Sequence, residues 1–126
     1  MAPASAQNKI LLVNGEVTLQ YLRALMLRMK GYDVDSTTTL EEAKNKIAED
    51  DYRLVIVDVG YFAEPGLLFC EEIKTKYPKI KVLLQSDNQL YLSPSSCPDK
   101  VVSKQDGPHS FISEVEAMLE AGQELA

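Results

Sequence analysis

The stretch "RLVIVD", residues 53–58, contains a continuous run of branched aliphatic residues at 54–57 and ends on the carboxylate of Asp58. Branched side chains favour strands. A strand without polar alternation is typical of a parallel sheet that is covered on both faces. The stretch therefore predicts a buried strand with Asp58 at its carboxyl end.

Apolar runs and helical patterns alternate along the rest of the chain. Further strands are predicted at "KILLV" (9–13), "YDVDS" (32–36), "IKVLL" (80–84) and "KVV" (100–102). Helices are predicted between them, over 18–30, from residue 40 onward, and between Pro65-Gly66 and Pro78, with a last helix after Gly107-Pro108. Strands that alternate with helices of this length predict an α/β fold with a doubly wound, five-stranded parallel sheet.

Helical spacing of apolar residues supports each of these helices. The positions that repeat are Leu22, Leu25, Met26 and Met29; Leu40, Ala43, Ile47 and Ala48; Phe69, Ile73 and Tyr77; and Phe111, Ile112, Val115, Met118 and Leu119. Thr39 and Glu42 have the spacing of a capping box. Tyr21, Tyr32 and Tyr77 are expected at the edge of the core.

One connection breaks the alternation. Between the fourth and fifth strands, "QSDNQLYLSPSSCPD" (85–99) offers only the apolar patch 90–92, followed by turn residues. The helix between these strands is therefore expected to be short or missing.

Length and charge limit the classes of function. The 126 residues fit one domain, with a flexible tail at 1–8, the folded domain at 9–122 and a C-terminal tail at 123–126. A net charge of −6 disfavours direct binding to nucleic acid or to an anionic membrane. The chain shows no export signal and no long apolar run, which indicates a cytoplasmic protein. Cys70 and Cys97 lack metal or disulfide spacing and are expected as reduced thiols.

Chemically useful residues follow the predicted strands. In open parallel sheets, sites form at the carboxyl ends of the strands. Those ends carry Asn14-Gly15-Glu16, Asp58, Gln85-Ser86-Asp87 and Ser103-Lys104. An aspartate can attack phosphorus and carry an acyl phosphate. A hydroxyl and an ammonium group can stabilise phosphoryl oxygens.

These stretches resemble the receiver domains of response regulators in two-component signalling. The resemblance rests on "KGYDV" (30–34), "YRLVIVDVGYFAEPGLLFCEEIK" (52–74) and "DKVVSK" (99–104), in order and spacing. It implies that Asp58 matches the phosphoacceptor, which a histidine kinase phosphorylates. It further implies that Ser86 and Lys104 match the hydroxyl and lysine positions, that Gly66 matches a loop glycine, and that the carbonyl of Gly60 matches a magnesium ligand.

The first strand departs from the family pattern. Receivers normally end this strand with two acidic residues that hold magnesium, whereas this chain has Asn14 and Gly15. Because Mg²⁺ prefers carboxylates and water, these changes remove most of its charged ligands. We expect no cofactor, and Mg²⁺ only weakly if at all, with Glu16, Asp58 and Gly60 as the remaining ligands. Glu16 is better explained as a solvated glutamate at a helix start.

Two more departures point to altered signalling. Val101 replaces the aromatic residue that the family places three positions before the lysine, and Gln105 replaces the proline after it. Asp58 and Lys104 can also be interpreted as a partly buried ion pair without further chemistry.

The leading hypothesis is an atypical receiver, not an enzyme, that acts through protein partners such as a histidine kinase or a downstream effector. The alternative is a functional phosphoacceptor that is phosphorylated on Asp58. A nucleotide- or flavin-binding domain has little support, because no glycine-rich phosphate loop follows the first strand. The sequence leaves open whether the chain is a stand-alone regulator or part of a longer protein.

Overall fold

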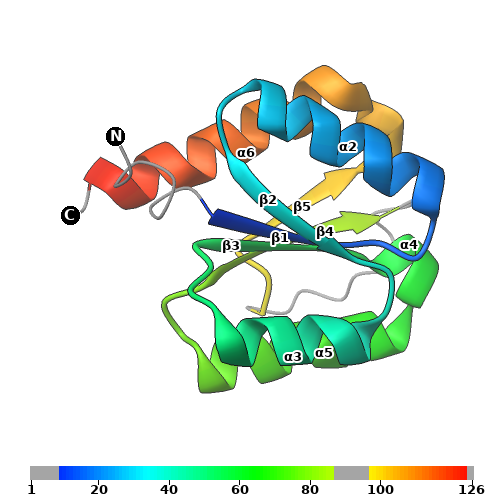
Figure 1. Ribbon diagram of the computed structural model, residues 1–126, viewed down its shortest axis with the longest axis vertical. Coiled ribbons are helices and arrows are strands. Elements are labelled where there is room, and N and C mark those ends of the chain that lie inside the picture. The colour runs from blue at the N-terminus through cyan, green and yellow to red at the C-terminus, as the bar shows by residue number, and fades with distance from the viewer. Residues whose placement is uncertain (1–8, 87–96, 125–126) are drawn as a thin grey trace.

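The protein folds as a five-stranded sheet between two layers of helices in a computed structural model that describes residues 9–86 and 97–124 (Figure 1). The elements, in chain order, are β1 (Lys9–Val13), α2 (Val17–Met29), β2 (Asp33–Thr37), α3 (Leu40–Glu49), β3 (Leu54–Asp58), α4 (Val59–Phe62), α5 (Glu64–Lys76), β4 (Lys81–Ser86), β5 (Lys100–Ser103), the 3₁₀ helix η2 (Lys104–Asp106) and α6 (Gly107–Glu124).

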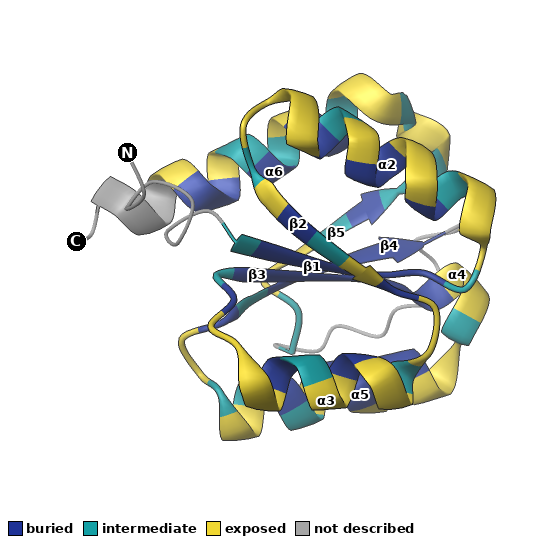
Figure 2. Ribbon diagram, in the orientation of Figure 1, coloured by how far each residue is buried: buried dark blue, intermediate teal, exposed yellow. Residues whose placement is uncertain are grey.

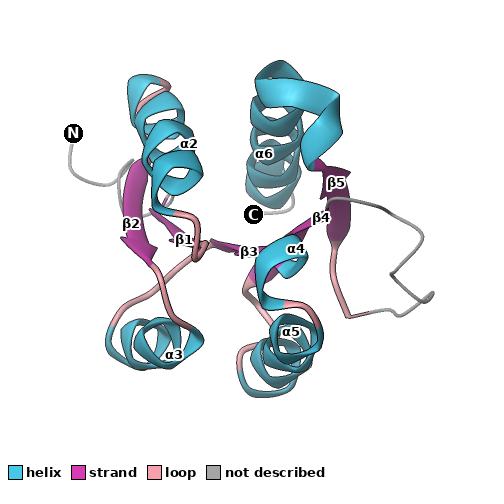
Figure 3. Cartoon of the chain, turned by 90° about the vertical axis from the view of Figure 1, so that its right-hand side faces the viewer, coloured by secondary structure: helices cyan, strands magenta, loops and turns pink. Residues whose placement is uncertain are grey.

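All neighbouring strands pair in parallel, in the order β2-β1-β3-β4-β5. This order places β3 at the centre and confirms the doubly wound α/β fold. Helices α2 and α6 cover one face of the sheet, and α3 and α5 cover the other (Figure 3). Because a helix connects each pair of described parallel strands from β1 to β4, both faces are buried, as the aliphatic run at 54–57 predicts.

The sheet divides the hydrophobic core into two clusters, because successive strand residues point to opposite faces. On the α2 and α6 side, the cluster contains Ile10, Leu12, Ala24, Leu27, Leu54, Ile56, Leu83, Phe111, Val115 and Leu119. On the α3 and α5 side, it contains Leu11, Val13, Ala43, Ile47, Val55, Val57, Phe69, Ile73, Val82 and Leu84. Figure 2 shows the resulting dark, buried strands between helices that are exposed on their outer sides.

Helix α2 differs from the others in how its apolar residues are used. Its buried positions are Gln20, Arg23, Ala24 and Leu27, whereas Leu22, Leu25 and Met29 are exposed. The predicted helix is confirmed, but three of its four periodic apolar residues face outward, whereas the fourth, Met26, packs partly against the core. Tyr21 is 63% exposed, so its expected place at the edge of the core is wrong.

The capping residue predicted for α3 is confirmed, since Thr39 Oγ1 accepts a hydrogen bond from the backbone N–H of Glu42 at 3.1 Å. Helix α5 begins earlier than predicted. Pro65 lies in its first turn, where a missing N–H costs nothing, rather than in a loop before the helix. Helix α6 continues to Glu124, beyond the expected domain end at residue 122.

The connection between β4 and β5 falls mostly on residues 87–96, so the predicted shortening of its helix lies outside the described residues. Within the described ranges, no helix has the length and apolar character that a membrane span requires.

Candidate functional site

The strand-end residues gather at one edge of the sheet. Figure 3 looks onto this edge, with the short helix α4 in front of β3. Asn14, Asp58 and Ser86 stand at the ends of β1, β3 and β4, and all three are buried. Lys104 follows β5 at the same edge. The structure therefore brings Asn14, Asp58, Ser86 and Lys104 to one edge of the sheet, as predicted, whereas Asp87 lies outside the described residues.

Asp58 is fully buried and both its carboxylate oxygens have protein partners. Its Oδ2 forms an ion pair with the Lys104 ammonium, whose side chain is 16% exposed. Its Oδ1 accepts a hydrogen bond from the backbone N–H of Tyr61 at 3.2 Å, which makes Asp58 the N-cap of α4. A buried carboxylate is stable only with such partners.

Asn14 occupies the first of the two positions that are acidic in the resembled family. It is fully buried, and its Oδ1 accepts a 2.8 Å hydrogen bond from the backbone N–H of Glu16. Its side-chain amide nitrogen has no hydrogen-bond partner among the described residues. Asn14 Oδ1, the side-chain oxygen that could bind a cation, therefore accepts a backbone hydrogen bond in the turn that leads into α2.

Gly15 occupies the second position, and the ring of Tyr61 lies against it. A Cβ atom built on Gly15 would overlap three ring carbons of Tyr61. The ring is 57% exposed and packs edge-to-face on Phe62, with centroids 5.0 Å apart. Any side chain at position 15 thus requires Tyr61 to move away.

The other two candidate metal ligands, Glu16 and Gly60, are both exposed. Glu16 is exposed at the N-cap of α2, where its side chain makes no capping hydrogen bond. Gly60 is exposed within the single turn of α4. Across residues 9–86 and 97–124, no three histidine, cysteine or acidic side chains come close enough to hold a metal ion.

Ser86 and Gln85 complete the edge on β4. Gln85 pairs in register with Asp58, whereas Ser86 pairs with Ser103. Gln85 is fully buried, and neither atom of its side-chain amide has a partner among the described residues. A buried amide without a protein partner is normally hydrogen-bonded to ordered water. Sequence reasoning assigned Gln85 no role, although its polar side chain after "KVLL" was the available signal.

The two positions that depart from the family near Lys104 have ordinary structural roles. Val101 packs on the α3 and α5 side of the core. The backbone N–H of Gln105 donates to Ser103 Oγ at 3.2 Å and so caps the turn η2. A proline at position 105 could not make this bond, because it lacks the N–H.

Gly66, matched to a family loop glycine, is buried in the first turn of α5. A Cβ atom there would lie 3.1 Å from the Phe62 Cβ and 3.2 Å from Val59 Cγ1. The glycine therefore lets α4 pack closely on α5, which helps to hold α4 next to Asp58.

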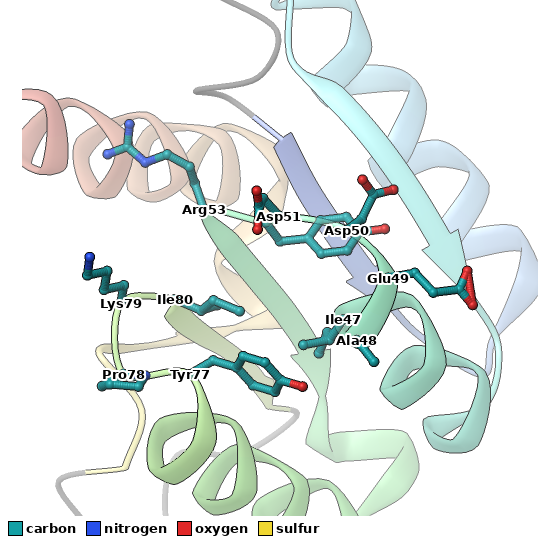
Figure 4. A pocket seen from close by; sticks show the side chains of 11 residues that line it. Ile47, Ala48, Glu49, Asp50, Asp51, Arg53, Tyr77, Pro78, Lys79 and Ile80 are labelled. Carbon is teal, nitrogen blue, oxygen red and sulfur yellow. The ribbon is translucent and has the colours of Figure 1, made fainter.

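A groove of about 720 Å³ lies at the opposite edge of the sheet, before the starts of β3 and β4. Figure 4 shows Tyr77 pointing toward Ile47 and Ala48 across the groove, while Arg53 turns toward α6. The guanidinium of Arg53 donates to the Leu119 carbonyl at 3.5 Å. The groove is thus separate from Asp58 and its partners.

Together, the fold and the site define a doubly wound domain with a capped, lysine-paired aspartate at the carboxyl end of its central strand. The family model described as "Response regulator receiver domain" matches residues 10–93, about two thirds of the chain. The chain belongs to this family.

Sequence and structural similarity to known response regulators supports the assignment to this family. The transcriptional regulatory protein BasR of Escherichia coli (strain K12) is 34% identical over 76 residues, which cover 60% of this chain and 34% of that protein. The chain thus spans about a third of that relative's length. Response regulator protein TrrA from Thermotoga maritima, solved in complex with Mg²⁺-BeF, is 28% identical with a TM-score of 0.80, covering 88% of this chain and 98% of TrrA.

A second structure contains the histidine kinase ThkA in complex with TrrA. It matches with 29% identity and a TM-score of 0.78, covering 89% of this chain and 98% of the matched chain. The present chain is therefore a receiver domain of the kind used in two-component signalling, a class of signalling modules.

Proposed function

We propose that this receiver signals mainly through protein contacts, and that magnesium-dependent phosphorylation of Asp58 is impaired or lost. The observation that carries the proposal is the packing of the Tyr61 ring against Gly15, which fills the space of a second acidic side chain.

The other side chains at the site also fit Mg²⁺ poorly. Mg²⁺ is held in octahedral geometry by carboxylates and water. Here the Asn14 oxygen is engaged by a backbone N–H, and both oxygens of Asp58 are engaged by Lys104 and Tyr61. Glu16 would have to leave its solvated position at the N-cap of α2. The side chains at this edge therefore do not fit Mg²⁺.

Without the metal, the chemistry of Asp58 is unfavourable for two reasons. An anionic phosphodonor would approach an anionic carboxylate without a Lewis acid to neutralise the charge, which forfeits several kcal/mol, or about a thousandfold in rate. The carboxylate would also have to leave Lys104 before it could attack phosphorus. Lys104 and Asp58 then serve mainly as a structural ion pair.

The partner is proposed to be a protein, either a histidine kinase or a downstream effector. The complex of ThkA with TrrA supports the first, because TrrA shares this fold. The net charge of −6 supports a protein rather than a nucleic acid.

A phosphorylation assay tests the proposal. The chain is incubated with an acyl phosphate and Mg²⁺, and phosphoryl incorporation is followed by intact mass spectrometry. We expect no incorporation above that of Asp58→Asn. The matched positive control is Asn14→Asp/Gly15→Asp/Tyr61→Ala, which returns two carboxylates and removes the ring. Rapid, magnesium-dependent incorporation in the unchanged chain would instead establish a functional phosphoacceptor.

A further inference from the structure

Exposed apolar side chains concentrate on α2. Among the described residues, the large hydrophobic side chains that remain exposed are Val17, Tyr21, Leu22, Leu25, Met29, Tyr61 and Leu68. The first five belong to α2, and their exposed fractions range from 42% to 79%. Figure 2 shows the outward side of α2 as a largely exposed surface that no other labelled element covers.

Four of these residues form a regular row, which we call the α2 row: Val17, Tyr21, Leu25 and Met29. Their spacing of four residues places them on one ridge of the helix, with Leu22 beside it. Such ridges pack into the grooves of a second helix at a crossing angle near −50°. At side-chain areas of roughly 150–200 Å² each, the row and Leu22 expose on the order of 500 Å².

The α2 row is symmetric about Arg23, the middle residue of the helix. Val17 and Met29 lie equally far from it, as do Tyr21 and Leu25. The same holds for the two charged residues at the ends, Glu16 at the N-cap and Lys30 at the C-cap. Neither end side chain has an ion-pair partner within residues 9–86 and 97–124.

We propose that α2 is a homodimerisation surface. The α2 row of one copy packs antiparallel against the α2 row of a second copy, across a two-fold axis at the level of Arg23. This arrangement pairs Tyr21 with Leu25 of the other copy and brings each Glu16 to the Lys30 of the other copy. A two-fold interface uses the same patch on both subunits, which requires such self-complementarity.

The area and the charges favour a second copy over other occupants. Two such patches together reach about 1,000 Å², the lower limit of a specific interface, so a dissociation constant in the micromolar range is expected. Helix α2 contains no acidic residue, but it has the Glu16 carboxylate at its N-terminal end and the cations of Arg28 and Lys30 at its C-terminal end. When two copies of the helix pack antiparallel, opposite charges therefore meet at both ends. The macrodipoles of the two helices oppose each other favourably in the same orientation.

Sedimentation velocity over a concentration series tests the proposal. We expect a reversible dimer of the full chain, and Leu25→Glu raises its dissociation constant about tenfold or more, because a charge then enters the interface. Leu68→Glu is the matched control, since Leu68 is a 57% exposed leucine on α5, and it leaves the dimer unchanged. Circular dichroism verifies that both variants are folded.

A charge exchange distinguishes self-association from binding to any other partner. Lys30→Glu weakens the dimer a few-fold, because it places two carboxylates together at each end. Adding Glu16→Lys restores the pairs with reversed sign and returns the dissociation constant to within about twofold. A chain that stays monomeric at all concentrations, a dimer indifferent to Leu25→Glu, or a double variant no better than Lys30→Glu would each overturn the proposal.

Discussion

The ion pair of Asp58 and Lys104 is the residue-scale feature on which the site depends. Lys104→Met leaves the Asp58 carboxylate buried without its cation, and we expect a loss of about 3 kcal/mol in the free energy of unfolding. Urea denaturation at neutral pH measures this loss. Lys79→Met, at an exposed lysine, should change stability little.

A double-mutant cycle separates the pair from other effects of these substitutions. Asp58→Asn/Lys104→Met should cost clearly less than the sum of the two single variants, because the second substitution removes the stranded charge. If the loss of unfolding free energy in the double variant equals the sum of the losses in the two single variants, the two side chains do not stabilise each other.

The contact of Tyr61 with Gly15 gives a second prediction at this scale. Gly15→Asp introduces a Cβ atom that overlaps the exposed Tyr61 ring, so the ring must turn away and give up its contact with Phe62, and we expect a loss of about 0.5–1 kcal/mol in stability. In the background of Tyr61→Ala, the same substitution should cost markedly less. Denaturant unfolding of the four proteins in this cycle measures the coupling, and equal costs in both backgrounds would refute the steric role of the ring.

At the scale of elements, Tyr52 connects the start of β3 to β2. Its hydroxyl donates to Asp35 Oδ2 at 2.7 Å. Burial, and then this hydrogen bond, raise the pKa of the Tyr52 phenol above its ordinary value of 10.0. Because the fold favours the protonated phenol, this stabilisation is complete below pH 10 and is lost as the pH rises further.

Tyr52→Phe removes the titrating phenol, so the free energy of unfolding should fall less steeply above pH 10 than in the unchanged chain. At pH 8 the same substitution should lower the free energy of unfolding, because the hydrogen bond to Asp35 is lost. Denaturation between pH 8 and pH 11 measures both effects. Tyr21→Phe is the control, since Tyr21 is exposed. The same alkaline slope in Tyr52→Phe as in the unchanged chain would contradict the assignment.

Cys70 and Cys97 connect α5 with the segment before β5. Cys70 is buried and Cys97 is half-buried, and burial raises the pKa of both thiols. Because the thiolate is the reactive form, labelling by an aromatic disulfide at neutral pH should be roughly tenfold or more slower than for a cysteine peptide. Urea should restore the full rate. Labelling of the folded chain at the peptide rate would contradict the burial of Cys70 and the partial burial of Cys97.

These elements also show what the sequence could predict. Strands β1, β3 and β4 are apolar runs, and α5 and α6 bury or half-bury the periodic positions expected of them, because burial and periodicity are local patterns. In α3, Ala43 and Ile47 are buried as expected, whereas Ala48 is exposed, so its expected place on the buried face is wrong. The single turn of α4 is too short for any period, and its cap is Asp58 itself. The outward apolar row of α2 was not foreseen, because periodicity identifies a helix face but not the side that it packs on.

At the scale of the whole molecule, the site depends on contacts between residues distant in sequence. The sequence identified Asp58, Ser86 and Lys104 because strand ends of a parallel sheet converge. It also showed that Asn14 and Gly15 lack carboxylates. It could not show that Tyr61 covers Gly15 or that Gln85 lies beside Asp58, since these contacts arise only when β1, β3 and β4 assemble.

We propose that this receiver domain keeps the fold of its family but lacks an effective magnesium-dependent phosphorylation site. A titration of the backbone amides by NMR, with Mg²⁺ and then with beryllofluoride as a phosphoryl mimic, tests it most directly. We expect no saturable shifts at millimolar Mg²⁺ around Asp58, Ser86 and Lys104, and shifts there in Asn14→Asp/Gly15→Asp/Tyr61→Ala. Saturable shifts in the unchanged chain that spread from Asp58 to β5 and α6 would contradict the claim.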